Sequence, residues 1–226
     1  MMNKNTIIKE YKAFKKIVKS DCPYPISLDN GYFFNIFSKV YLETIEEHSH
    51  IANNYYSING KGVLNLLFMD HYLILCHRLA HYIYKQQLDM DIADAIYYSA
   101  RVRTSTDIFY RANIGKYFMP THPLGSVIDS HSTYGEGFKL YNGVHIGPYD
   151  ILEKDPLKWE HPKFGDGVIL LAGSSVYGNT VIGDNVIVSA KSIIINEEIP
   201  SNCIVIGSSP RLMVKPNSQN NLRIIK

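Results

Sequence analysis

The chain has 226 residues, 46% of them apolar, and a formal net charge of +2. This length allows one large domain or two modest ones with a buried core, and the near-neutral charge excludes a global field that favours nucleic acid. Three widely spaced cysteines without a CxxC pair argue against a disulfide framework. No segment has the pattern of a signal peptide or a membrane span, so we expect the cytoplasm.

Residues 1–106 are predicted to form an α-helical domain. Ile7, Tyr11, Phe14 and Val18 recur at spacings of three and four, which is typical of an amphipathic helix. Lysines fill the rest of this segment, and we favour a helix packed on its own domain over one that lies on a membrane surface. Three further helices are expected, over 33–47, 64–87 and 92–102.

The second half of the chain has a different period. Every sixth residue over one long stretch is apolar: Phe164, Leu170, Val176, Ile182, Val188 and Ile194. The residues two places earlier are small or β-branched, and the same period continues upstream to Ile128 and, after a two-residue slip, to Ile114 and Ile108. A period of six fits neither a helix nor an alternating strand. It predicts a triangular coil of about eighteen residues, several of which stack into a parallel β-helix.

The predicted fold is therefore of the α+β class, with the helical domain followed by a β-helix over 107–216 and a tail over 217–226. The repeat lapses where many charged and proline residues occur, and we interpret 148–163 as an excursion loop.

Three stretches carry a resemblance to a known family. An HRLAH sequence at 77–81 resembles the helix motif before the β-helix of serine O-acetyltransferases. Asp107 and His122 have the separation of that family's catalytic pair, and 198–211 resembles the terminal coil and acetyl-CoA loop. The chain thus resembles the hexapeptide-repeat acyltransferases, in particular the serine O-acetyltransferases, over residues 62–216.

The resemblance implies a left-handed β-helix that transfers acetyl from acetyl-CoA to the hydroxyl of a small acceptor. It further implies a homotrimer, or a dimer of trimers, with active sites between neighbouring β-helices, and no need for a metal. We expect neither nucleic acid nor a membrane span among the partners.

His122 and Asp107 are the candidate catalytic residues. In a coil of about eighteen residues, a fifteen-residue offset returns close to the same corner of the next coil. A histidine suits the proton steps of acetyl transfer, and a carboxylate behind it fixes its tautomer. The alternative is a surface histidine in a proline-rich turn beside an unrelated aspartate.

The candidate acceptor site lies in and before the excursion loop. His161 matches a family stretch that borders the acceptor pocket, and Trp159 and Glu160 stand beside it. His145 precedes the loop and could line the same cleft, although we expect both it and His131 to be surface residues rather than catalytic ones. His161 itself could be a loop histidine beside a packing tryptophan.

Acetyl-CoA is expected to contact small residues on outward corners of the last coils, followed by the terminal loop. The resemblance assigns these contacts to Gly147, Ala172, Gly173, Ser189, Ala190, Gly207, Ser208, Arg211 and Lys215. Arg211 and Lys215 could pair with phosphates of CoA or could belong to a solvated edge. His77 and His81 have a metal-ligand spacing on a helix, but we interpret them as core or interface residues and predict no metal ligands.

Two alternatives remain for the function. The family's carboxylate-binding arginine is replaced here by Glu160, so a sugar of a surface polysaccharide pathway could replace serine as the acceptor. The other alternative is a non-catalytic hexapeptide scaffold or regulatory paralogue, against which the presence of Asp107 and His122 argues.

Overall fold

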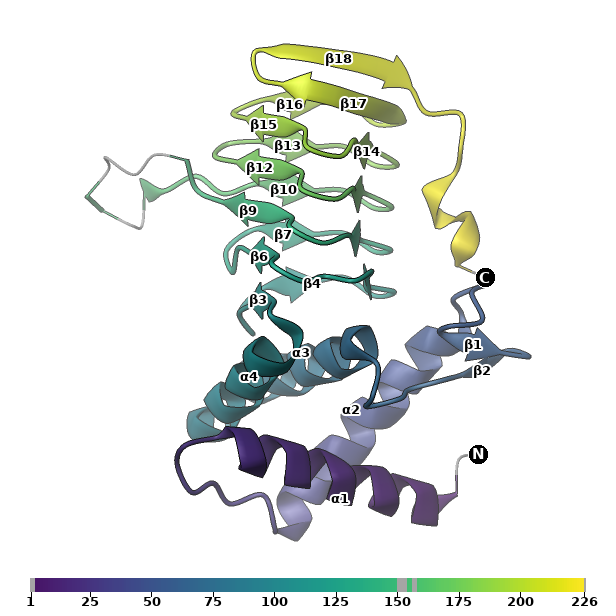
Figure 1. Cartoon of the computed structure of the whole chain (residues 1–226), viewed down its shortest axis with the longest axis vertical. Helices are drawn as coiled ribbons and strands as arrows, with labels where there is room; N and C mark the ends of the chain where they lie inside the picture. The colour runs from purple at the N-terminus through teal and green to yellow at the C-terminus, as the bar shows by residue number, and fades with distance from the viewer. Residues whose placement is uncertain (1–2, 150–153, 156–157, 226) are drawn as a thin grey trace. The chain divides into compact units, whose positions relative to one another are not determined.

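The computed structural model describes residues 3–149, 154–155 and 158–225 of the chain. The chain divides into two compact units, Met1–Thr104 and Ser105–Lys226 (Figure 1). The first unit is helical, and the second is a stack of short parallel strands wound into a solenoid (Figure 1). The predicted α+β class, a helical domain followed by a left-handed parallel β-helix, is confirmed.

The helical unit contains four helices and a small hairpin. The helices are α1 (Lys4–Asp21), α2 (Gly31–Ser49), α3 (Met69–Lys85) and α4 (Met90–Thr104), and the hairpin strands are β1 (Ser57–Ile58) and β2 (Lys61–Gly62). The third helix begins five residues later than the expected 64. The side chain of Asn65 accepts a hydrogen bond from the backbone N–H of Leu67 (3.0 Å), because asparagine favours such a local turn over a helix.

The first helix is packed on its own unit, as the sequence favours. Ile7, Tyr11, Phe14 and Val18 are buried, and the Phe14 ring lies 5.3 Å from that of Phe37 in α2. Lysines occupy most of the exposed face. No helix in the described part of the chain is long and apolar enough to cross a membrane.

Two buried histidines lie together in the helical unit. The ring centroids of His48 and His71 are 5.0 Å apart, and both side chains are almost fully buried. Burial is the largest influence on both groups, and it lowers the pKa of His48 and lowers that of His71 to about 3. His71 is therefore neutral at neutral pH, and its Nδ1 accepts a hydrogen bond from the backbone N–H of Asn65 (3.1 Å).

The solenoid has three faces, each a ladder of parallel strands. The first face contains β3 (Asp107–Ile108), β6 (Val127–Ile128), β9 (His145–Gly147), β12 (Ser175–Tyr177) and β15 (Ile193–Ile195). The second face contains β4 (Asn113–Ile114), β7 (Thr133–Tyr134), β10 (Lys163–Phe164), β13 (Val181–Ile182) and β16 (Glu198–Ile199). The third face contains β5 (Met119–Pro120), β8 (Lys139–Leu140), β11 (Ile169–Leu170), β14 (Ile187–Val188) and β17 (Cys203–Ser208).

We name the corners after the faces that they join. Corner A leads from the third face to the first, through turns at 121–126, 141–144, 171–174 and 189–192. Corner B leads from the first face to the second, and the chain leaves the solenoid there between β9 and β10 (Figure 1). Corner C leads from the second face to the third. The loop expected over 148–163 lies partly outside the described residues, and Lys163 pairs with Thr133 and Val181 in the second face.

The period of six corresponds to the residues that point into the solenoid. Leu170 pairs in register with Leu140 below and Val188 above, and all three are fully buried. Ser174 and Thr180, two places before core residues, are also fully buried, because only a small or β-branched side chain fits inside the corner. The aliphatic ladder thus holds successive coils in register.

The two-residue slip in the repeat is an insertion at corner A. The turn at 121–126 between β5 and β6 is two residues longer than the turn at 141–144 between β8 and β9. Gly125 has a φ of +71° and Gly143 a φ of +64°, the same left-handed conformation at matching places in the two turns. The two extra residues therefore lie within 121–124, before Gly125, and His122 belongs to this enlarged part of the turn.

The last coil is closed by a hairpin and by the C-terminal segment. The strand β18 (Arg211–Pro216) pairs antiparallel with β17. The following segment, with the 3₁₀ helix η2 (Asn221–Ile224), lies on corner C, where the side chain of Asn221 donates to the carbonyl of Gly167 (2.7 Å). Gly137 has a φ of +66°, and a Cβ there would lie 2.5 Å from Cδ2 of Leu222, so the tail packs closely over this glycine.

Candidate active site

His122 lies on the enlarged turn of corner A. Its side chain is exposed and its φ is +49°, a left-handed conformation that histidine adopts more readily than most residues with a Cβ. Two hydrogen bonds fix the turn to the coil below: Gly125 N–H to the carbonyl of Ser105 (2.8 Å), and the Thr106 hydroxyl to the carbonyl of Pro123 (2.9 Å). The imidazole of His122 is thus carried by a turn whose backbone is held in place by hydrogen bonds.

Asp107 begins the first face at the same corner. Its backbone N–H donates to the carbonyl of Ser126 at the end of the His122 turn (2.8 Å). Because Ile108 is buried, the half-buried side chain of Asp107 is directed to the outside of the solenoid. The fold brings Asp107 and His122, the two candidate catalytic residues, to one corner in adjacent coils.

A column of small residues continues corner A above His122. Its backbone is linked from coil to coil by hydrogen bonds from Gly143 N–H to Leu124 (2.9 Å), from Gly173 N–H to Asn142 (2.9 Å) and from Lys191 N–H to Ala172 (3.0 Å). Ser189 and Ala190 belong to the same turn as Lys191. A Cβ on Gly143 would lie 3.7 Å from the Cα of Gly173, so little side-chain bulk covers the backbone here. Four residues expected to contact acetyl-CoA, namely Ala172, Gly173, Ser189 and Ala190, therefore form one track.

The terminal hairpin reaches the top of this track with one end only. Gly207 N–H donates to the hydroxyl of Ser192 at corner A (3.1 Å), and Ser208 pairs with Ile193. Arg211 pairs with Ser208 and is exposed, whereas Lys215 pairs with Ile204 at the far end of the hairpin. Four residues of strand separate the two cations by about 13 Å. Arg211 lies near the track, and Lys215 lies toward corner C.

His145 extends from the first face toward corner A. It pairs in register with Val127, directly above the His122 turn, and its Nε2 lies 3.2 Å from the carbonyl oxygen of Gly125. A carbonyl only accepts, so Nε2 carries the proton and Nδ1 is left as an acceptor. His145, which the sequence placed on the surface, is indeed exposed, but its ring lies against the turn that presents His122.

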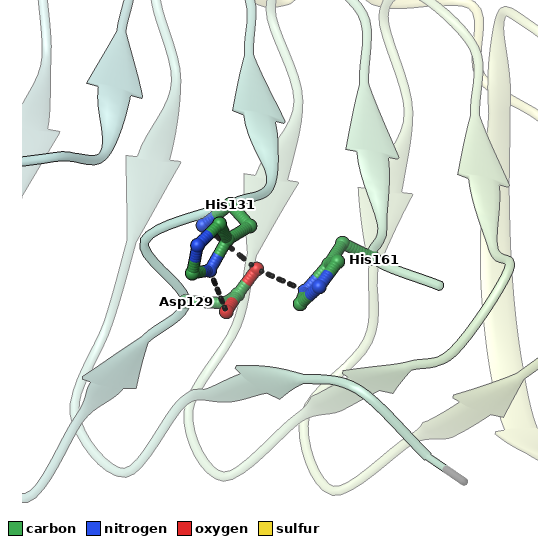
Figure 2. Close-up of side chains that lie close together, drawn as sticks. All are labelled: Asp129, His131 and His161. Carbon is green, nitrogen blue, oxygen red and sulfur yellow. Dashed lines mark hydrogen bonds and ion pairs between the residues drawn. The ribbon is translucent and has the colours of Figure 1, made fainter. Parts of the chain in front are cut away.

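The remaining expected acceptor residues lie at corner B. His161 lies two residues before the start of β10, and its Nδ1 lies 2.9 Å from Oδ2 of Asp129, which follows β6 (Figure 2). Both side chains are mostly buried, with 17% of His161 and 9% of Asp129 exposed. Because a carboxylate only accepts, the proton is on Nδ1 of His161, and Nε2 is an acceptor. Trp159 is half-buried and Glu160 exposed in the preceding segment.

Gly147 does not belong to the track of small residues. It ends β9 at corner B, and its carbonyl accepts from the N–H of Gly178 (3.0 Å). Within one copy of the chain, the candidate residues are thus divided between two edges of the first face. His122, Asp107 and the small-residue track lie at corner A, and His161 and Gly147 lie at corner B.

Asp129 is a site residue that was not expected from the sequence. Asp129 and His161 are separated by 32 residues, including the excursion between β9 and β10. A count in steps of six loses its register across that excursion, so the contact is invisible to periodicity. The available signal was the sequence Asp-Ser-His-Ser at 129–132, a cluster of polar donors at a corner.

Comparison with known proteins agrees with this architecture. Residues 161–196 match the family model described as bacterial transferase hexapeptide (six repeats). The chain therefore contains hexapeptide repeats and resembles the serine acetyltransferases. A serine acetyltransferase from Synechococcus elongatus is 32% identical over 157 residues, which are 70% of this chain and 62% of that enzyme. This alignment therefore spans less than two thirds of the Synechococcus enzyme.

A second relative and two solved structures extend the similarity over both units of the chain. A serine acetyltransferase from Helicobacter pylori is 29% identical over 174 residues, 77% of this chain and 95% of that one. The structure of Neisseria gonorrhoeae serine acetyltransferase in complex with serine has a TM-score of 0.68 at 25% identity and covers 90% of this chain and 81% of its own. Brucella abortus serine acetyltransferase in complex with coenzyme A has a TM-score of 0.69 at 20% identity, covering 93% and 83%.

Proposed function

We propose that this hexapeptide-repeat protein is an acetyl-CoA-dependent O-acetyltransferase that acetylates the hydroxyl of serine. The observation that carries the proposal is corner A, where His122 and Asp107 stand at the foot of a track of small residues that leads to the terminal hairpin. Such a track has room for the long, thin pantetheine arm of acetyl-CoA along the backbone. The thioester end of that arm would then lie near the imidazole of His122. The relatives named above are serine acetyltransferases, and one was solved with coenzyme A.

In the proposed reaction, Nε2 or Nδ1 of His122 takes the proton of the acceptor hydroxyl as its oxygen attacks the thioester carbonyl. The carbon–oxygen bond forms and a tetrahedral oxyanion develops. The carbon–sulfur bond then breaks, and the imidazolium returns the proton to the departing CoA thiolate. Asp107 orients the imidazole of His122 and stabilises its charged form. The products are the O-acetyl ester and CoA, and no metal takes part.

The division of candidate residues between two corners supports a site shared by two copies of the chain. If each β-helix places its corner A against corner B of a neighbour, His122 of one copy faces His161 of the next. A cyclic trimer repeats this heterologous contact three times and closes. His161, oriented by Asp129, then presents Nε2 to the acceptor from the neighbouring copy. We therefore propose a trimer, or a dimer of trimers, as the active form.

Serine is favoured as the acceptor over a sugar because the named relatives are serine acetyltransferases. Glu160, which replaces the family's carboxylate-binding arginine, is compatible with serine as the acceptor. Its side chain is exposed, so it does not present a buried anion to the acceptor carboxylate. Lys163 is also exposed, two residues after His161, and supplies a cation on the same edge.

The decisive experiment is release of CoA thiol by the purified full-length protein, with L-serine and a panel of sugars and nucleotide sugars as acceptors. We expect release with L-serine, and a loss of about 10²–10⁴ in kcat in His122→Ala with acetyl-CoA binding retained. His50→Ala, which removes a histidine of the helical unit whose side chain is 43% exposed, is the matched control and should be fully active. Release with a sugar alone would reassign the acceptor, and no acetyl-CoA binding would leave the scaffold alternative.

A further inference from the structure

Three side chains at corner B form a cluster of metal-binding type. Asp129, His131 and His161 each direct a ligand atom to one place, and these three atoms lie within 4.8 Å of one another (Figure 2). Oδ2 of Asp129 lies 2.9 Å from Nδ1 of His161, and Oδ1 lies 4.0 Å from Nδ1 of His131. The two imidazole rings are 4.9 Å apart, on either side of the carboxylate (Figure 2).

The donor set suits a divalent transition metal. Two imidazoles and one carboxylate are ligands of zinc, which binds each of them at about 2.0–2.2 Å. Three such ligands around a tetrahedral ion lie about 3.3 Å from one another. In the structure His161 Nδ1 lies 2.9 Å from Oδ2 of Asp129, and His131 Nδ1 lies 4.0 Å from Oδ1. Rotation of the carboxylate and of the exposed His131 ring brings one oxygen and both nitrogens toward this spacing.

The carboxylate at the centre of the cluster is held in position. Oδ2 of Asp129 accepts hydrogen bonds from the backbone N–H and the hydroxyl of Ser132, both at 2.7 Å. Such outer contacts orient a ligand before the metal arrives. The cluster is also open on one side, because 61% of the His131 side chain is exposed while only 9% of Asp129 is. A hydrated ion can therefore bind first to the exposed His131 and then reach the carboxylate of Asp129, which is already held in position.

We propose that Asp129, His131 and His161 form a zinc-binding site, and that zinc bound there inhibits acetyl transfer. Zinc on Nδ1 of His161 moves the imidazole proton to Nε2, so Nε2 no longer accepts a hydrogen bond from the acceptor. The metal-binding half rests on the cluster alone. The inhibitory half rests on the proposed function, in which His161 contacts the acceptor. Zinc is thus a regulator and not a cofactor, since the reaction at corner A proceeds on His122 without a metal.

The binding half is tested by calorimetric titration of ZnCl2 into chelator-treated full-length protein, and by the visible absorption of Co²⁺ as a substitute ion. We expect one zinc ion per chain and a tetrahedral Co²⁺ spectrum. His131→Ala and Asp129→Asn should each weaken zinc binding at least tenfold. His50→Ala is the matched control, because His50 also lies near a carboxylate, 3.2 Å from Glu46, and is exposed. Equal zinc affinity in all four proteins would overturn the site.

The inhibitory half is tested by CoA release with and without ZnCl2. We expect zinc to inhibit the wild-type protein, a chelator to restore its activity, and His131→Ala to keep its basal activity while losing its sensitivity to zinc. Inhibition of equal strength in His131→Ala would overturn regulation through this cluster. If no acceptor is acetylated at all, the proposed function fails, whereas the zinc titrations still decide the metal site.

Discussion

Nε2 of His145 lies 3.2 Å from the carbonyl oxygen of Gly125, so a side chain of the first face is tied to the turn that presents His122. We predict that His145→Ala lowers kcat/KM for the acceptor by about tenfold, the effect of losing one hydrogen bond that orients the site. The thermal midpoint should stay unchanged because the side chain is exposed. Steady-state kinetics in metal-free buffer measure the effect. His131→Ala, the control at corner B, should have wild-type kinetics, and equal losses in both variants would contradict a role specific to corner A.

The small-residue track predicts a selective defect in acetyl-CoA binding. Gly173 has a φ of +69°, and a Cβ there would lie 3.6 Å from Cγ of Lys191, so a larger side chain projects onto the track. We expect Gly173→Val to raise KM for acetyl-CoA at least tenfold, with little change in KM for the acceptor.

Gly60→Val is the control for this substitution. Gly60 has nearly the same φ, +72°, but a Cβ there meets nothing within 4 Å, so it introduces the backbone strain without blocking the track. Comparable rises in KM for acetyl-CoA in both variants would show that strain, and not obstruction, is the cause.

A site shared between copies predicts complementation of inactive variants. His122→Ala and His161→Ala should each be inactive alone. When the two chains are co-expressed in equal amounts, about a quarter of the interfaces combine an intact His122 with an intact His161 from the neighbour. Tandem affinity purification removes the unmixed trimers, and each mixed trimer keeps one such interface in three. We therefore expect about a third of the wild-type activity in the purified mixed trimers, measured by CoA release. A mixture as inactive as its parents would place the two histidines in separate functions.

The buried histidine His71 predicts a loss of stability in acid. Its pKa is lowered from 6.5 to about 3 in the folded protein, so the unfolded chain takes up a proton below pH 6.5 that the folded chain refuses until about pH 3. The stabilisation is complete above pH 6.5 and is lost progressively between these two values. At pH 5 the loss from this group is about 2 kcal/mol.

Urea unfolding of the full-length protein, followed by the helical circular dichroism signal at pH 7 and pH 5, measures this loss. We expect His71→Phe, which cannot titrate, to reduce the difference between the two pH values by about 2 kcal/mol. His50→Ala, at a histidine whose side chain is 43% exposed, should leave the difference unchanged. A pH dependence that is the same in all three proteins would mean that other groups control the acid sensitivity.

The sequence was sufficient to predict the solenoid because its core is a local repeat. Leu170, Val176 and Ile194 are buried as the period of six requires, since each coil repeats the same inward step. The start of α3 was less predictable: the apolar pattern begins at Leu64, but the side chain of Asn65 competes for backbone hydrogen bonds and delays the helix to Met69.

The candidate site was predictable only where the repeat is continuous. The placement of Asp107 and His122 at one corner follows from coil length, whereas the contact between Asp129 and His161 spans the excursion loop. The length of the excursion loop determines which side chains at corner B come into contact. No local sequence pattern gives that length its structural meaning. The position of His145 against Gly125 depends on a side-chain direction, which periodicity does not determine either.

The hairpin of β17 and β18 has a consequence for how the solenoid behaves at high concentration. A stack of parallel strands ends in unpaired backbone groups, and such an end can recruit another chain and grow into a fibre. Here β18 pairs antiparallel with β17, and Pro216 at its end lacks a backbone donor while Arg211 and Lys215 add like charges. The last coil is thereby protected from end-to-end polymerisation, the hazard inherent in a fold built by repetition.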